Sequence, residues 1–180
     1  MSKLMLALVG LRSAINVGMI LRVAETYCTQ VIIVGSADLL GAPDKMSTIS
    51  DFSCGALQRK GYCTADSVAG IAANSKVKRL VAATIDRNAI PVDTFRFADG
   101  DAVLLGNEYD GLPQEVSASC HAFVRIPMAD VWTPKPPSVN PIDPLRTTAV
   151  SNDGQPNLNV AIAAGIICYQ WHIGQKSPCR

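Results

Sequence analysis

The segment AVLLGNEYDGLP, residues 102–113, places a short apolar run directly before a turn that contains two glycines. A run of this length that ends in a glycine-rich turn is typical of a buried strand, and open α/β sheets bind their ligands at the carboxyl ends of their strands. Gly106 has no side chain, so we expect a cofactor to lie against its backbone. Pro113 is suited to open the next helix. The segment therefore predicts a ligand-binding strand end in an α/β domain.

The rest of the chain alternates short apolar runs with segments of helical period, which indicates a mostly parallel sheet flanked by helices. Strands are expected near residues 4–9, 31–34, 79–84, 102–105 and 122–126. Helices are expected near residues 17–28, 54–60, 67–73 and 113–118, with a long final helix over 159–172. Four residues of the final helix have helical spacing and are expected to face the sheet or a partner subunit: Val160, Ala164, Ile167 and Trp171.

The length of 180 residues predicts a single domain over residues 1–180, with enough apolar sequence to form a core. Residues 129–156 depart from the pattern because they hold six of the eleven prolines. Such a Pro-rich insertion is either functional or a tolerated surface loop. Trp132 and Lys135 within it supply an aromatic ring and a cation that are suited to contact a nucleotide.

The composition argues against several classes of protein. The formal charge is +1, so the chain lacks the strong basic bias of many nucleic-acid-binding domains. Several cations still leave room for a local basic patch: Arg12, Arg59, Lys60, Lys76, Lys78, Arg79 and Arg125. The six cysteines show no Cys-x-x-Cys spacing, which argues against zinc and predicts reduced thiols in a cytoplasmic protein. The apolar run 4–9 is too short for a signal peptide or a membrane span, so we expect neither a metal nor a membrane.

A second motif lies near the N-terminus and combines Asn16 and Gly18 with Arg22 and Glu25. We expect Asn16 to be the N-cap of a helix, and Gly18 to let another backbone or a ligand approach closely. On its own, Arg22 is expected to be solvated, or ion-paired with Glu25 or Glu108. A third motif consists of IPM at residues 126–128 and LNV at residues 158–160, on the two sides of the insertion.

The three motifs, in this order, resemble those of the SpoU (TrmH-like) family of SPOUT-superfamily RNA 2′-O-ribose methyltransferases. The resemblance covers residues 4 to about 171. It implies an α/β domain with a C-terminal deep trefoil knot, an uncommon exception to normal chain topology. It also implies that S-adenosyl-L-methionine is the cofactor, that the substrate is a ribose 2′-hydroxyl of tRNA or rRNA, and that a homodimer builds each active site from two subunits.

The resemblance assigns roles to particular residues. It implies a catalytic cluster of Arg22, Asn16, Glu108 and Asn159. It implies that the cofactor is bound around Thr84, Gly106, Asn107, Gly111, Ile126, Met128 and Leu158. The family role of Arg22 is to activate the 2′-hydroxyl. A guanidinium is a poor base because its pKa is about 12 or more, so stabilising the alkoxide or gripping the adjacent phosphate is the easier role.

The chain departs from the family pattern at residue 157. Family members usually have Ser-Leu-Asn-Val-Ser, whereas this chain has NLNVA at residues 157–161. The exchange of serine for Asn157, together with the low net charge, leaves a non-catalytic RNA- and cofactor-binding dimer as an alternative. A small-molecule α/β enzyme with a nucleotide cofactor is a third reading, because glycine turns after strands occur in many such folds.

Overall fold

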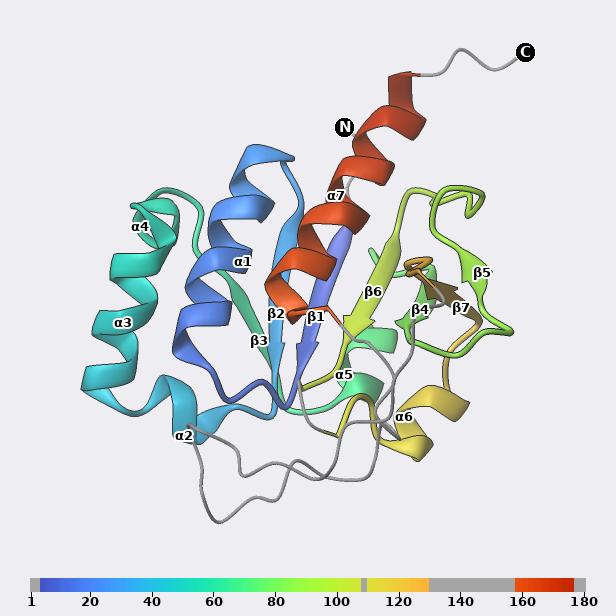
Figure 1. Ribbon diagram of the computed structural model, residues 1–180. Coiled ribbons are helices and arrows are strands. Elements are labelled where there is room, and N and C mark those ends of the chain that lie inside the picture. The colour runs from blue at the N-terminus through green and yellow to red at the C-terminus, as the bar shows by residue number, and fades with distance from the viewer. Residues whose placement is uncertain (1–3, 108–109, 130–157, 177–180) are drawn as a thin grey trace.

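The computed structural model describes residues 4–107, 110–129 and 158–176, and its centre is a parallel sheet of seven strands (Figure 1). The strand order is β3-β2-β1-β6-β4-β7-β5, and every neighbouring pair is parallel. The strands are β1 (Met5–Val9), β2 (Gln30–Val34), β3 (Cys63–Ala65), β4 (Arg79–Ala83), β5 (Ile90–Pro91), β6 (Asp101–Leu105) and β7 (Ala122–Arg125).

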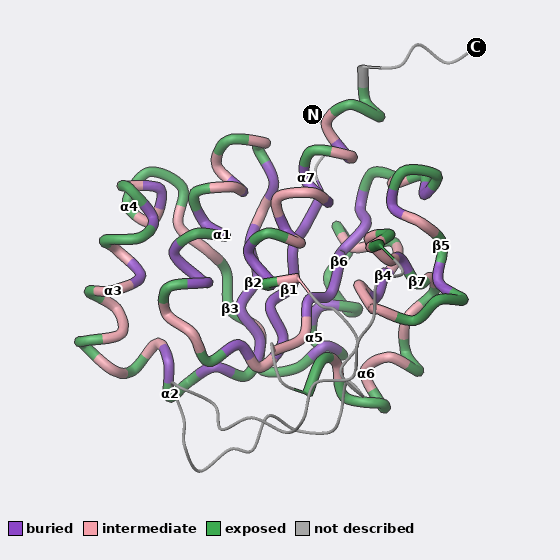
Figure 2. The backbone as a smooth tube through the Cα atoms, viewed as in Figure 1, coloured by how far each residue is buried: buried purple, intermediate pink, exposed green. Residues whose placement is uncertain are grey.

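Helices cover both faces of this sheet (Figure 1). They are α1 (Ala14–Thr26), α2 (Ala37–Leu40), α3 (Pro43–Ser53), α4 (Ala56–Arg59), α5 (Val68–Ala72), α6 (Gln114–Ala118) and α7 (Val160–Lys176). One face packs against α1 and α7, and the opposite face packs against α5 and α6. Because both faces are covered, β1 and β6 are buried along their whole length, as the purple tube in Figure 2 shows.

Alternate residues of each central strand enter the two cores, as the two-residue period of a strand requires. In β1, Leu6 and Leu8 belong to the core beneath α1 and α7, whereas Met5 and Ala7 belong to the core beneath α5. This arrangement explains why β1 reads in the sequence as a continuous apolar run. It also places the carboxyl ends of β1, β4 and β6 side by side at one edge of the sheet.

The five predicted strands are confirmed, each with ends within one residue of the observed ones. The two strands that the sequence did not predict, β3 and β5, lie at the two edges of the sheet and have three and two residues. The helices α2 and α3 were not predicted either. Only Ile49 and Ser53 of α3 are buried, so the apolar periodicity of this segment is too weak to predict a helix.

The start of α1 corrects the sequence prediction at Asn16. The helix begins at Ala14, and its N-cap is Ser13, whose side chain accepts a hydrogen bond from the Asn16 N–H at 3.3 Å. The prediction that Asn16 is the N-cap is therefore wrong. As the third residue of the helix, Asn16 is buried, and its side-chain oxygen accepts a hydrogen bond from Asn159 of a distant segment.

Gly18 permits a close contact between two helices. A Cβ atom at this position would lie 2.7 Å from Cβ of Phe52 and 2.8 Å from the carbonyl oxygen of Ile49, both in α3. The sequence predicted that either another backbone or a ligand approaches Gly18. In the structure the backbone of α3 approaches it, and Gly18 does not line the pocket described below. The glycine therefore contributes to the packing of α1 on α3.

The long helix α7 was predicted over 159–172 and is observed from Val160 to Lys176. Its four periodic residues, Val160, Ala164, Ile167 and Trp171, are all buried in the core of this chain. They face the sheet and α1, so they are not candidates for contact with a partner subunit.

Candidate functional site

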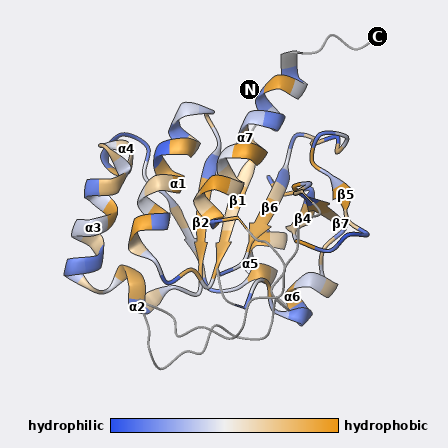
Figure 3. Cartoon of the chain, viewed as in Figure 1, coloured by the Kyte–Doolittle hydropathy of each residue, from blue (hydrophilic) through white to orange (hydrophobic). Residues whose placement is uncertain are grey.

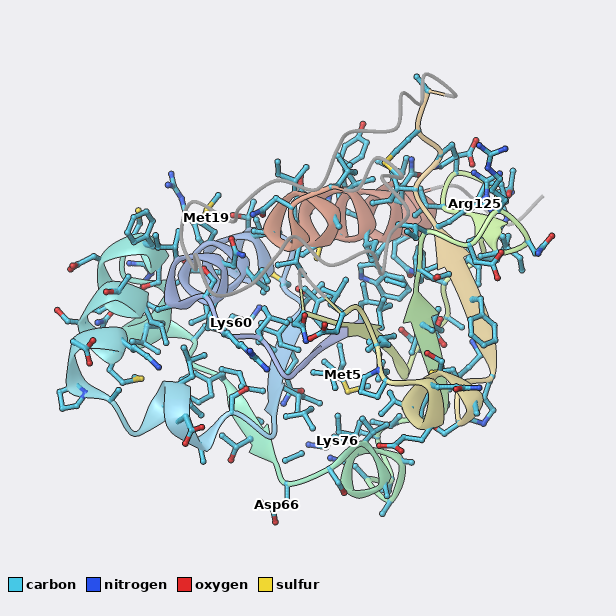
Figure 4. The ribbon with its side chains drawn as sticks, turned by 60° about the horizontal axis from the view of Figure 1, so that its bottom comes forward. Met5, Met19, Lys60, Asp66, Lys76 and Arg125 are labelled. Carbon is cyan, nitrogen blue, oxygen red and sulfur yellow. The ribbon has the colours of Figure 1, made fainter. Side chains whose placement is uncertain are left out.

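A pocket of about 470 Å³ opens at the carboxyl ends of β4, β6 and β7. Its walls come from residues 83–86 at the end of β4, residues 106, 107 and 110–112 after β6, residues 123–126 and 128 of β7 and beyond, and the first turns of α7. Figure 4 brings this edge of the sheet forward. The pocket therefore lies where parallel α/β sheets place their ligands.

The seven residues that the sequence assigned to cofactor binding all line this pocket. They are Thr84, Gly106, Asn107, Gly111, Ile126, Met128 and Leu158. They come from four separate segments of the chain, so the sequence motifs converge on one cavity. The remaining wall is largely apolar and includes Leu105, Val124 and Ile167.

The turn after β6 folds back on itself. The N–H of Gly111 donates to the carbonyl oxygen of Asn107 at 3.1 Å, and the N–H of Asp110 donates to the Asn107 side chain at 2.8 Å. Gly111 has a φ of +66°, a conformation that favours glycine. The residues between them, Glu108 and Tyr109, lie outside the described residues, so the predicted catalytic role of Glu108 stays a prediction.

Gly106 is required by the path of this turn. A Cβ atom at Gly106 would overlap with the backbone of Gly111 and of Leu112. The close approach of a cofactor to the Gly106 backbone, which lines the pocket, stays a prediction. The turn crosses directly over Gly106, and this crossing forms the part of the pocket wall that lies between β6 and α6.

Two asparagines of the predicted catalytic cluster meet next to the pocket. Nδ2 of Asn159 donates to Oδ1 of Asn16 at 3.0 Å, and Oδ1 of Asn159 accepts from the N–H of Ala161 at 2.9 Å. Asn159 therefore caps α7 and ties its first turn to the first turn of α1. Neither asparagine lines the pocket, but the adjacent Leu158 and Val160 both do.

Arg22 lies away from this pair. It is six residues along α1 from Asn16, which turns its side chain about 240° around the helix axis and moves it about 9 Å along it. Arg22 is exposed and makes no side-chain hydrogen bond or ion pair with any residue that the structure describes. It is not among the residues that line the pocket.

Glu25 does not pair with Arg22, which corrects one of the expected ion pairs. Instead, Arg59 of α4 binds both carboxylate oxygens of Glu25 at 2.7 Å. This hydrogen-bonded pair lowers the pKa of Glu25 and raises that of Arg59. The other expected partner of Arg22, Glu108, lies outside the described residues.

Three charged residues line the pocket, as far as the structure describes it, and the sequence motifs did not identify two of them. Asp110 belongs to the glycine turn, whereas Asp86 carried no signal beyond its position near the end of a strand, and Arg125 was expected only as part of a local basic patch. Nε of Arg125 donates to the carbonyl oxygen of Ala89 at 3.2 Å. Figure 4 shows Arg125 at the end of β7, beside the green segment that leads to β5.

An apolar surface runs along two neighbouring helices. Ile15 and Met19 are exposed on α1, and Ile162, Tyr169 and Ile173 are exposed on α7. We call these five residues the α1–α7 surface. Figure 3 shows hydrophobic segments on both helices, and Figure 4 shows Met19 on the outer side of α1. Exposed apolar residues gathered on adjacent helices are typical of an interaction surface.

The described residues contain no group of three or more His, Cys, Asp or Glu side chains that could hold a metal ion. No described helix combines the length and the apolar character that crossing a membrane requires.

The model of the SpoU rRNA Methylase family matches residues 3–133 of the chain. This match spans the first two motifs and the IPM segment of the third. No curated protein matches the chain in sequence.

Solved structures share the fold. A structure that concerns the 2-OH methylation of C/U34 on tRNA has a TM-score of 0.72 and 23% identity, with 97% of both chains covered. The SpoU methyltransferase AviRb from Streptomyces viridochromogenes, in complex with AdoMet, has the same TM-score and identity over 98% of this chain. An AdoMet-bound rRNA methyltransferase from Sinorhizobium meliloti has a TM-score of 0.68 and 22% identity over 99%. The chain spans only 59% and 57% of these last two proteins.

Proposed function

Because the chain belongs to the SpoU rRNA Methylase family, we propose that it transfers a methyl group from S-adenosyl-L-methionine to a ribose 2′-hydroxyl of tRNA or rRNA. The observation that carries the proposal is the single pocket lined by all seven residues assigned to the cofactor. The neighbour that concerns 2-OH methylation of tRNA covers nearly the whole chain and supports the choice of a ribose hydroxyl.

The pocket is suited to this cofactor. Its volume of about 470 Å³ is within the range of about 300–1,000 Å³ that small-molecule sites have. An apolar wall of Leu105, Val124 and Ile167 is complementary to an adenine ring. Two carboxylates and one guanidinium complement the two positive charges and the one negative charge of S-adenosyl-L-methionine.

The bound cofactor supplies a methyl group on a positively charged sulfur. The chain has to hold the ribose hydroxyl in line with that group, and alignment of this kind lowers a barrier by several kcal/mol. We assign Arg22 to the phosphate beside the reacting ribose, or to the oxygen that gains negative charge, with the proton leaving to phosphate or water. We assign Asn16, Glu108 and Asn159 to positioning Arg22 and the ribose.

This assignment requires a homodimer. Arg22 points to solvent and lies away from the pocket of its own chain, so in our proposal it completes the site of the partner subunit. The α1–α7 surface supports the same arrangement, because it joins the helix that carries Arg22 to the helix that walls the pocket. We also propose the trefoil knot and a cytoplasmic location; the Pro-rich insertion, which the knot would involve, lies almost wholly outside the described residues.

Ile162→Asp and Tyr169→Asp are each expected to convert the dimer to a monomer. Both side chains are about half exposed in the single chain, at 52% and 50%, so a charge there leaves the core intact and removes apolar contact area between subunits. Light scattering at micromolar concentration measures the mass. The control is Ile90→Lys, because Ile90 is equally exposed on β5, away from both helices. A wild-type monomer would contradict the shared site.

The test of the function is transfer of labelled methyl from S-adenosyl-L-methionine to unmodified total tRNA and rRNA, followed by nucleoside analysis. We expect 2′-O-methyl nucleosides as the product. A methylated base would refute the ribose assignment while leaving an RNA methyltransferase. Cofactor binding without methylation of any RNA would favour the non-catalytic dimer, and Asn157→Ser would then show whether the missing family serine is the cause.

A further inference from the structure

The pocket has a charged corner built on one short loop. Asp86 and Arg125 both line the pocket, and both are held by the loop 84–89 that follows β4. Oδ1 of Asp86 accepts from the N–H of Asn88 at 2.9 Å, and Nε of Arg125 donates to the carbonyl oxygen of Ala89 at 3.2 Å. The same loop is closed by a hydrogen bond from the N–H of Ala89 to the carbonyl oxygen of Asp86 at 3.1 Å. A carboxylate and a guanidinium are thus held by the same short loop at one pocket.

The two groups do not neutralise each other. No nitrogen of Arg125 lies within ion-pair distance of Asp86, although both residues belong to the described part of the chain. The single bond through Nε leaves the two terminal nitrogens of the Arg125 guanidinium available as donors. The carboxylate of Asp86 retains further acceptor sites beyond its bond to Asn88.

An opposite pair of charges on one pocket is complementary to an amino-acid group. The α-carboxylate and the α-ammonium of an amino acid are attached to one carbon, so a site for them needs a cation and an anion that are adjacent but not bonded to each other. The inner wall of the pocket is apolar, with Leu105 and Val124 buried in it. The charged corner is therefore complementary to the methionine end of the cofactor, and the inner wall to its adenosine end.

We infer that Asp86 and Arg125 form the subsite for the amino-acid group of the cofactor, with Arg125 binding the carboxylate and Asp86 binding the ammonium. The inference rests on the proposed function, because it assigns parts of the same ligand. By this inference, Arg125 and Asp86 determine the affinity and the specificity of the pocket for the cofactor. The inference requires no movement of the loop.

Calorimetry with three ligands distinguishes the contact of Arg125 with the carboxylate from the contact of Asp86 with the ammonium. S-adenosylhomocysteine carries both charges, its decarboxylated analogue carries only the ammonium, and 5′-methylthioadenosine carries neither. Arg125→Gln is expected to weaken S-adenosylhomocysteine about 10-fold or more, the size of a charge-assisted hydrogen bond, and to leave the other two ligands unchanged. Asp86→Asn is expected to weaken S-adenosylhomocysteine and the decarboxylated analogue, but not 5′-methylthioadenosine.

The matched control is Arg87→Gln, since Arg87 is an exposed cation of the same loop that does not line the pocket. It is expected to bind all three ligands as the wild type does. Arg125→Lys keeps the charge but loses the planar fork, so it should recover part of the affinity for S-adenosylhomocysteine only. Retained binding of 5′-methylthioadenosine in each variant shows that the pocket is folded.

Two results would overturn the inference while leaving the proposed cofactor in place. One is an Arg125→Gln variant that weakens all three ligands by the same factor, since that is the effect of a distorted loop. The other is a wild-type protein that binds 5′-methylthioadenosine as tightly as S-adenosylhomocysteine. A wild-type protein that binds none of the three would refute the proposed function itself.

Discussion

Arg22→Ala is expected to lower the rate of methyl transfer by about 100- to 1,000-fold and to leave the affinity for S-adenosylhomocysteine unchanged. The reason is the role proposed for Arg22: it does not line the pocket of its own chain, and at the partner's site it contacts the RNA and not the cofactor. If it acts on the phosphate or on the developing alkoxide, its effect is confined to turnover. Labelled methyl transfer to tRNA and rRNA measures the rate, and calorimetry measures the affinity.

Arg22→Lys distinguishes between two roles of the arginine. Lysine keeps the positive charge, so a simple electrostatic role retains part of the activity, whereas a bidentate grip on phosphate does not. Lys45→Ala is the control, because Lys45 is a cation of α3 that is not part of the proposed site. Turnover of Arg22→Ala equal to that of the wild type would show that the N-terminal motif, which contains Arg22, has been assigned the wrong chemistry.

Gly106→Ala is expected to weaken S-adenosylhomocysteine by about 100-fold, through the shape of the pocket. The added Cβ overlaps with the backbone of Gly111 and Leu112, and a methyl group has no rotamer that would relieve the overlap. The turn that forms one wall of the pocket must therefore move. Calorimetry measures the affinity of the variant for S-adenosylhomocysteine, and a thermal melt measures its stability.

Gly165→Ala is the matched control for this substitution. Gly165 lies in α7, and a Cβ atom there would meet nothing within 4 Å. Alanine in a helix is about 0.5–1 kcal/mol more favourable than glycine, so this variant should be slightly more stable and bind the cofactor product normally. Normal affinity in Gly106→Ala would mean that the turn does not cross Gly106 as described.

The sequence predicted the parts of the fold that are decided locally. The strands β1 and β6 are covered on both faces, so each is a continuous apolar run that can be read directly. The edge strands β3 and β5 are too short to show a period. The helix α3 was missed because its contact with α1 depends on the absence of a side chain at Gly18 more than on apolar residues of its own.

The residues of the candidate site were likewise predicted where local sequence decides their position, and not where contacts between distant segments do. Motif order placed seven residues on one pocket, since strand ends of a parallel sheet meet at one edge. Contacts between distant segments were beyond prediction. The pairing of Glu25 with Arg59, 34 residues away, left Arg22 without the expected partner. The cap of α1 was misassigned because Ser13 and Asn16 are both good N-cap residues, and only the structure shows which one accepts the hydrogen bond.

The bond between Asn16 and Asn159 joins residues 143 positions apart, and this has a consequence for how the protein is made. A ribosome adds about 5–20 residues per second, so the sheet strands leave it several seconds before α7 does. During that interval the apolar face beneath α7 is uncovered and the pocket lacks one wall. Each newly made chain therefore acquires its ligand site only after α7 has left the ribosome, and from then on the ligand favours the docked helix by mass action.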